Sequence, residues 1–256
     1  MKIQYCSDLH LEFPDNYKFI KENPLKSEGD ILILAGDVVP FAIINDFDFF
    51  FDYISNNFKY TYWIPGNHEY YHYDISEKGI SFNEQIRENV FLVNNISVVH
   101  DDVKFLFTTL WSEITPDHQW DIRSRLSDFR VINNKSNTLS INYYNYLHKQ
   151  SVEFLKEELM SNNSENTVVV THHVPTFKNY PEKYKASSIN QAFTVEMHDF
   201  INDSNIDIWV YGHHHINTDE FEINKTKLLT NQLGYVKFED TSYINGKFVE
   251  LGSELK

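Results

Sequence analysis

Five short segments of the 256-residue chain carry side chain types that bind metal ions in proteins. Each places Asp, Asn or His directly after an apolar run of strand length. They are Ser7-Asp8-Leu9-His10, Gly36-Asp37, Gly66-Asn67-His68-Glu69, Thr171-His172-His173 and Gly212-His213-His214-His215. Carboxylate, amide and imidazole groups supply the mixed oxygen and nitrogen ligands that first-row divalent cations accept. If folding brings these segments together, a cation is needed to compensate their buried charge and lone pairs.

The spacing within two of the segments indicates which side chains point the same way. Residues two apart in extended backbone project to the same side. Asp8 and His10 can therefore share one metal, and His213 and His215 can reach two neighbouring metals. His214 then points elsewhere, toward the ligands or into the protein.

The elements that must position these segments are predicted from the apolar pattern. Runs of strand length alternate with longer segments of helical periodicity, which indicates an α/β fold with a mainly parallel sheet. The predicted strands cover residues 3–6, 31–34, 60–64, 103–110, 167–170 and 207–211, and the predicted helices cover residues 43–58, 81–89, 139–160 and 194–201. Loops at the carboxyl ends of such strands share one edge of the sheet, where ligands bind. The five polar segments should therefore meet there.

Two regions lack clear periodicity, residues 112–137 and residues 174–190. We expect both to form loops on this scaffold, where substrate contacts are often placed. After residue 221, three short segments joined by turns such as Asn245-Gly246 are expected to be further strands.

The first of these regions holds Arg123, Arg125 and Arg130, a high density of arginine for so acidic a chain. A guanidinium group binds phosphate or carboxylate through two hydrogen bonds, so one of them could hold a second anionic group of a substrate. We expect Arg130 to lie nearest the metals, because residues 128–132 resume an ordered apolar pattern. The alternative is a surface ion pair between Arg130 and Asp128.

Composition limits the class of protein. The chain has 22 Lys and Arg against 37 Asp and Glu, a net charge of −15 that argues against loose binding to nucleic acid. Cys6 is the single cysteine, so an intramolecular disulfide is impossible and the reducing cytoplasm is the expected location. No apolar run approaches the roughly 20 residues of a membrane span. We expect one domain over residues 1–256, with no membrane partner.

In their order along the chain, the five segments resemble the motifs of the calcineurin-like metallophosphoesterases. Those motifs are Asp-x-His, Gly-Asp, Gly-Asn-His-Asp/Glu, a lone His and Gly-His-x-His, and the resemblance covers residues 8–215. The opening Ser7-Asp8-Leu9-His10-Leu11-Glu12-Phe13 resembles a bacterial subgroup of these enzymes. The resemblance implies an α/β fold, a four-layered αββα sandwich of two mixed β-sheets flanked by helices. Its dinuclear metal site would lie between the sheets, at the carboxyl ends of the strands.

The resemblance also implies a role for each motif residue. The implied ligands are Asp8, His10 and His215 for the first metal, Asn67, His172 and His213 for the second, and Asp37 as a bridge between both. Only one of the adjacent His172 and His173 should face the site, and the family's ligand is the first His after its strand. His68 is implied to be no ligand but a donor to the phosphate or the leaving oxygen. Asn67 could also donate its amide protons to the phosphate.

Residues expected near the substrate are Arg130, Tyr71 and His173. Tyr71 belongs to a run of aromatic residues, 70–73, that either lines the pocket or belongs to the core.

The implied activity is hydrolysis of phosphomonoester or phosphodiester bonds of a small phosphorylated substrate. Two divalent metals about 3.5–4 Å apart would bind the attacking hydroxide and polarise the phosphoryl oxygens. The ligand types suit Mn, Fe, Zn, Ni and Co nearly alike. Two alternatives remain, a nuclease acting on single-stranded nucleic acid and a non-catalytic metal-binding scaffold. The net charge of −15 argues against a nuclease, and the presence of Asp37, Asn67 and His68 argues against a non-catalytic scaffold.

Overall fold

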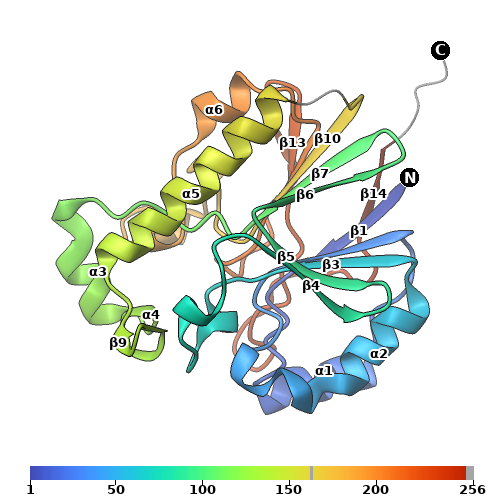
Figure 1. The fold of residues 1–256 in the computed structure, drawn as a ribbon, viewed down its shortest axis with the longest axis horizontal. Coiled ribbons are helices and arrows are strands. Elements are labelled where there is room, and N and C mark those ends of the chain that lie inside the picture. The colour runs from blue at the N-terminus through green and yellow to red at the C-terminus, as the bar shows by residue number, and fades with distance from the viewer. Residues whose placement is uncertain (162–163, 252–256) are drawn as a thin grey trace.

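Two six-stranded mixed sheets form the centre of the computed structural model, which describes residues 1–161 and 164–251 (Figure 1). The first sheet has the order β14-β1-β2-β3-β5-β4 and consists of β1 (Lys2–Cys6), β2 (Ile31–Ala35), β3 (Tyr60–Ile64), β4 (Phe82–Arg87), β5 (Val90–Asn94) and β14 (Phe248–Glu250). The second has the order β12-β13-β11-β10-β7-β6 and consists of β6 (Ile96–His100), β7 (Val103–Thr108), β10 (Asn166–Thr171), β11 (Ile208–Val210), β12 (Phe221–Ile223) and β13 (Thr226–Leu229). A separate short ribbon pairs β8 (Asn133–Asn134) with β9 (Asn137–Thr138).

Helices cover the outer face of each sheet, which makes four layers (Figure 1). The first sheet is covered by α1 (Pro14–Glu22) and α2 (Asp48–Asn57), and the second by α5 (Ile141–Met160) and α6 (His198–Asn202). Two further helices, α3 (Gln119–Arg125) and α4 (Asp128–Val131), form an arm that stands away from the sandwich. The predicted αββα sandwich of two mixed sheets flanked by helices is confirmed.

Alternation of side chains within the strands explains the layers. In β2, Ile31, Ile33 and Ala35 pack into the apolar cluster between the two sheets. Leu32 and Leu34 point the other way, into the cluster beneath the helices. Both faces of this strand are therefore buried, and its sequence is apolar throughout, as expected for a central parallel strand.

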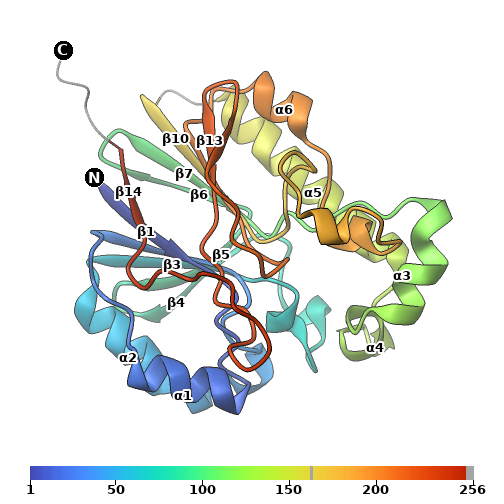
Figure 2. The same ribbon diagram turned by 180° about the vertical axis from the view of Figure 1, so that it is seen from behind.

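The central strands of each sheet run parallel, and only the edge pairings are antiparallel. In the first sheet β1, β2, β3 and β5 are parallel, and in the second β7, β10, β11 and β13. The segment between β13 and β14 crosses from the second sheet to the first (Figure 2). The carboxyl ends of strands from both sheets thus supply one shared site.

Most predicted elements lie within a few residues of their expected places, but the helix predicted for residues 81–89 is wrong. These residues form β4, an edge strand antiparallel to β5. Phe82 and Ile86, four residues apart, would share one face of a helix, but residues an even number apart also share one side of a strand. Two other predicted helices are shortened, because residues 41–47 form a 3₁₀ turn before α2 and α6 covers only His198–Asn202. The predicted loop at residues 112–137 contains α3, α4 and the short ribbon.

Across the described residues, every helix is too short or too polar to be a candidate for crossing a membrane.

Candidate metal centre and substrate cavity

The five polar segments meet at one place, each at the exit of a different strand. Asp8 and His10 follow β1, Asp37 follows β2, Asn67 and His68 follow β3, His172 follows β10, and His213 and His215 follow β11. The ligand-type atoms here form two clusters that overlap at Asp37, each with its atoms within 4.8 Å of one another. A third group at the same spacing joins His10 with Glu12 and His68. The first cluster contains Asp8, His10, Asp37 and His215, and the second contains Asp37, His172 and His213. Asp37 belongs to both clusters, as a bridging carboxylate would.

The backbone of these exits is left-handed rather than extended. The φ angles are 55° at Asp8, 47° at His10, 54° at Asp37, 79° at His213 and 53° at His215. The side chains of the two predicted pairs, Asp8 with His10 and His213 with His215, do project together. They do so from left-handed backbone and not from a continuing strand. Non-glycine residues with positive φ are strained and persist where the surrounding structure fixes them, often at functional sites.

Ring nitrogens of opposing segments face each other at short distances inside the clusters. Nε2 of His10 lies 3.0 Å from Nε2 of His215, and Nε2 of His172 lies 3.0 Å from Nδ1 of His213. Asp37 Oδ2 lies 3.3 Å from His172 Nε2, and Asp8 Oδ1 lies 3.4 Å from His215 Nε2. Lone pairs from separate segments therefore converge on common points, as they do around a metal.

The other nitrogen of each of these histidines is anchored by an oxygen. His10 Nδ1 lies 3.2 Å from Glu12 Oε1, and His215 Nδ1 lies 3.0 Å from Glu239 Oε2. His172 Nδ1 lies 2.9 Å from the Ala35 carbonyl oxygen, and His213 Nε2 lies 3.3 Å from that of Ala192. Such partners fix the tautomer and orientation of a metal-binding imidazole.

Asn67 provides a direct test of whether a metal pair fits the site. Its Oδ1 is buried and has no hydrogen-bond partner, a costly arrangement for an amide oxygen. Its Nδ2 donates to Asp128 Oδ1 at 2.9 Å and to the Tyr71 hydroxyl at 3.3 Å, which fixes the oxygen on the opposite side. The free oxygen, the carboxylates of Asp8 and Asp37 and four anchored imidazoles fit two divalent metal ions.

The backbone passes close to the site, where two glycines are required. At Gly36 a Cβ would lie 2.3 Å from His172 Nδ1, and φ is +90°. At Gly66 it would lie 2.2 Å from Asp37 Oδ1. A side chain at Gly36 would displace His172, and one at Gly66 would displace Asp37.

Glu69 holds the exits of two neighbouring strands together. Its carboxylate accepts hydrogen bonds from the backbone N–H groups of Asp37 at 2.9 Å, Val38 at 2.6 Å and Gly66 at 2.6 Å. It also accepts one from Trp63 Nε1 at 3.1 Å, and it is fully buried. Glu69 therefore fixes the positions of Asp37 and Gly66 relative to each other.

His68 lies beside the clusters with a different set of contacts. Its Nδ1 is 2.9 Å from Glu12 Oε1, its ring stacks on Tyr71 at 4.1 Å between centroids, and its backbone N–H donates to Asp37 Oδ1. Burial favours the neutral ring, but the carboxylates of Asp37 and Glu12 raise the pKa of His68 above its usual value. Burial likewise opposes ionisation of Glu12, yet the His10 and His68 rings lower its pKa to about 2.

Two other buried histidines have lowered pKa values. Burial and the neighbouring His172 ring hold the pKa of His173 well below the usual value, and burial lowers that of His214 to about 4. His214 pairs with Gln232, and His173 lies 3.2 Å from the Tyr144 hydroxyl. Both rings are therefore neutral.

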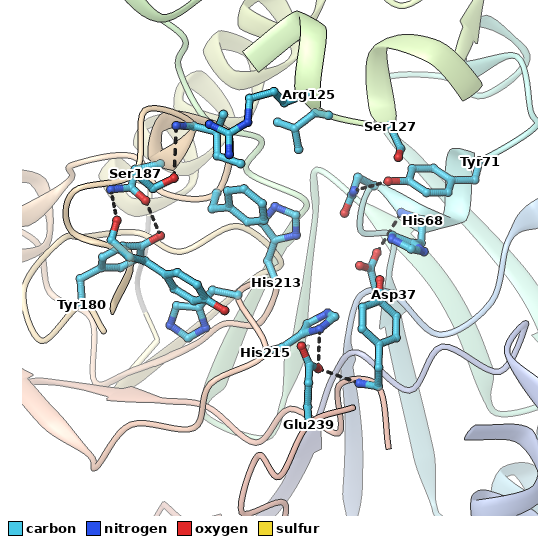
Figure 3. A pocket seen from close by; sticks show the side chains of 18 residues that line it. Asp37, His68, Tyr71, Arg125, Ser127, Tyr180, Ser187, His213, His215 and Glu239 are labelled. Carbon is cyan, nitrogen blue, oxygen red and sulfur yellow. Dashed lines mark hydrogen bonds and ion pairs between the residues drawn. The ribbon is translucent and has the colours of Figure 1, made fainter. Parts of the chain in front are cut away.

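A cavity of about 470 Å³ opens beside the metal centre (Figure 3). Of the three residues expected near the substrate, Tyr71 lines it, whereas His173 and Arg130 are not among its lining residues. The Arg130 guanidinium instead donates to the backbone carbonyls of Ser124 at 3.0 Å and Arg125 at 3.4 Å. The alternative ion pair with Asp128 does not form either, since Asp128 accepts from Asn67 and the Tyr71 hydroxyl.

Sequence reasoning missed three residues of the site, namely Glu12, Asp128 and Glu239. It named Arg125 among three candidate arginines but preferred Arg130, whereas Arg125 lines the cavity. Glu12 had a signal in its spacing, two residues after His10. Asp128 and Glu239 lie far from any motif, and no local pattern marks them.

The chain is similar in sequence to a known protein family and to a viral protein. Residues 1–217 match the model of the calcineurin-like phosphoesterase family. Uncharacterized protein L509 of Acanthamoeba polyphaga mimivirus is 32% identical over 259 residues, covering 91% of each chain.

Two solved structures are similar in fold. The phosphopantetheinyl hydrolase PptH of Mycobacterium tuberculosis has a TM-score of 0.67 at 16% identity, over 92% of this chain and 90% of that one. A dimetal phosphatase from Danio rerio has a TM-score of 0.47 at 10% identity, over 91% of this chain and 87% of that one.

Proposed function

Because the chain belongs to the calcineurin-like phosphoesterase family, a family of metal-dependent enzymes, we propose that it hydrolyses phosphomonoester or phosphodiester bonds of a small phosphorylated molecule. The observation that carries this proposal is Asp37, whose carboxylate is shared by two clusters of ligand atoms beside a histidine that belongs to neither. A metal-binding scaffold would need the clusters but not His68 in this position.

The proposed ligands divide between two metals that share Asp37. One metal is held by Asp8, His10 and His215, and the other by Asn67, His172 and His213. When bound, two divalent ions supply Lewis acidity toward water and toward the phosphoryl oxygens.

His68 is the proposed proton donor. Glu12 holds Nδ1, which leaves Nε2 to face the leaving oxygen of the ester. A water oxygen bonds to phosphorus as the water gives up one proton to solvent, the bond from phosphorus to the leaving oxygen breaks, and the Nε2 proton passes to that oxygen. The His68 ring then takes up a proton from solvent. The stacked Tyr71 ring and the Glu12 carboxylate keep His68 oriented for this transfer.

A hydrolysis panel on metal-reconstituted protein tests the proposal. It compares a phosphomonoester, a phosphodiester, a cyclic nucleotide, pyrophosphate and single-stranded DNA. We expect metal-dependent hydrolysis of one or more small esters, abolished in Asp37→Ala and retained in Asp46→Ala, an exposed aspartate with the same charge change. Cleavage of DNA alone would identify a nuclease. A metal-loaded protein inactive on the whole panel would favour a scaffold.

A further inference from the structure

The cavity extends well beyond the metal centre. At one end lie Asp37, His213 and His215, and at the other lies Arg125, with Tyr180 and Tyr71 on opposite sides (Figure 3). Its volume of about 470 Å³ falls in the range of sites that enclose a whole small molecule. A phosphate group at the metals would leave most of this space for the rest of the substrate.

Arg125 is the single arginine or lysine among the described residues that line this cavity. Within the described part of the chain it has no carboxylate at ion-pair distance, and its Nη1 donates to Ser188 Oγ at 3.1 Å. Arg87 shows the opposite case, since its guanidinium is occupied by Asp48 and Asp52. Among the described residues Arg123 and Arg130 have no ion-pair partner either, so what distinguishes Arg125 is its place in the lining of the cavity.

The position of Arg125 is fixed by its neighbours. Arg125 is the last residue of α3, and Arg130 donates to the carbonyl oxygens of Ser124 and Arg125 at that helix end. The hydrogen bond to Ser188 joins α3 to the loop whose residues Ser187 and Ile189 line the cavity. The planar guanidinium group can therefore bind an anion with little loss of conformational entropy.

Aromatic side chains make up part of the cavity wall. Tyr180, Tyr184 and Phe193 all line the cavity. The Phe193 ring stacks on that of His213, with centroids 4.7 Å apart and an angle of 27°. Flat aromatic walls favour a flat, ring-containing ligand.

We propose that Arg125 binds a second anionic group of the substrate. The substrate would then be a phosphate ester whose flat, ring-containing part carries another phosphate or carboxylate, as in a nucleoside bisphosphate. This inference rests on the proposed function only for the phosphate that lies at the metals.

Binding measurements on metal-loaded His68→Asn protein test this inference without depending on turnover. The ligands are adenosine 5′-monophosphate and adenosine 3′,5′-bisphosphate, and the quantity measured by calorimetry is the ratio of their dissociation constants. We expect the bisphosphate to bind about tenfold tighter, the worth of one charge-assisted contact. Arg125→Ala should reduce this ratio to near one, and Arg125→Lys should keep part of it.

Arg123→Ala is the matched control, because Arg123 is an exposed arginine of the same helix that does not line the cavity. It makes the same change in net charge and should keep the full ratio. Equal binding of the two nucleotides to the parent protein would overturn the inference. So would a ratio that Arg125→Ala and Arg123→Ala lower alike, since that reports general charge attraction.

The two proposals fail separately. An Arg125-dependent ratio in a protein that hydrolyses nothing on the panel would leave this inference standing and remove the proposed function. Hydrolysis of small esters combined with a ratio of one would do the reverse.

Discussion

The metal end and the Arg125 end of the cavity are held in place by different means. At the metal end, ligands leave buried strands, and oxygens of Glu12, Glu239 and two backbone carbonyls anchor their rings. At the other end, residues of an arm and a loop face each other, joined by contacts such as Arg125 to Ser188 and Thr115 to Gln191. The metal end needs these buried supports, because metal ligands tolerate displacements of only about 0.5 Å. Recognition of the rest of a substrate can be changed through loops while the scaffold stays intact.

The largest expected effect is at Asp37, the residue shared by both clusters. Wild-type protein reconstituted with excess Mn and desalted should retain more than one equivalent of metal by elemental analysis. Asp37→Ala should lose most of it, because both clusters lose an anionic ligand at once. Asp46→Ala should behave as wild type. Unchanged metal content in Asp37→Ala would refute the shared site.

The next effect is on turnover at His68. His68→Ala should keep its metal and its fold while kcat falls by roughly 10²–10⁴, the usual worth of general acid catalysis. Substrates with good leaving groups should lose less, because their leaving oxygen needs no proton. Loss of metal in this variant, or a full rate on alkyl esters, would show that His68 is not the acid.

A substitution at Glu69 tests whether its buried hydrogen bonds stabilise the strand exits at the metal end. Each oxygen of Glu69 accepts from two N–H groups, so in Glu69→Gln, where an amide nitrogen replaces one oxygen, two buried donors lose their acceptor. We expect the free energy of unfolding of metal-free protein to fall by about 1–3 kcal/mol. Urea unfolding measures this, with the exposed Glu88→Gln as control. A variant as stable as that control would contradict the role given to Glu69.

The smallest effect belongs to the arm. Arg130→Ala removes hydrogen bonds to carbonyls at the end of α3, so we expect a loss of about 0.5–1 kcal/mol in the free energy of unfolding. It should change the bisphosphate-to-monophosphate ratio less than Arg125→Ala does. A larger change in Arg130→Ala would return Arg130 to the place that the sequence suggested for it.

The sequence predicted the metal end in detail. Asp8, Asp37, His172 and His213 each follow an apolar run within a few residues, so their place in the fold depends only on where strands end. Parallel strand ends gather at one edge, and this local information was enough to bring all the expected ligands together. The failure at residues 81–89 has a similar local cause. Two apolar residues four apart are compatible with both a helix and an edge strand, and pairing with β5 decided for the strand.

Only the tertiary structure decided which side chains contact the clustered Asp, Asn and His residues. Glu239 reaches His215 from the segment that crosses between the sheets, and Asp128 reaches Asn67 from the arm. Arg125 lines the cavity. Arg130 does not, and its guanidinium is hydrogen-bonded to a carbonyl oxygen near the end of α3. The sequence by itself indicated that the polar segments follow strand ends and that their side chain types suit divalent metal ions. Contacts between residues distant in the chain depend on how loops pack, and no periodic pattern encodes that packing.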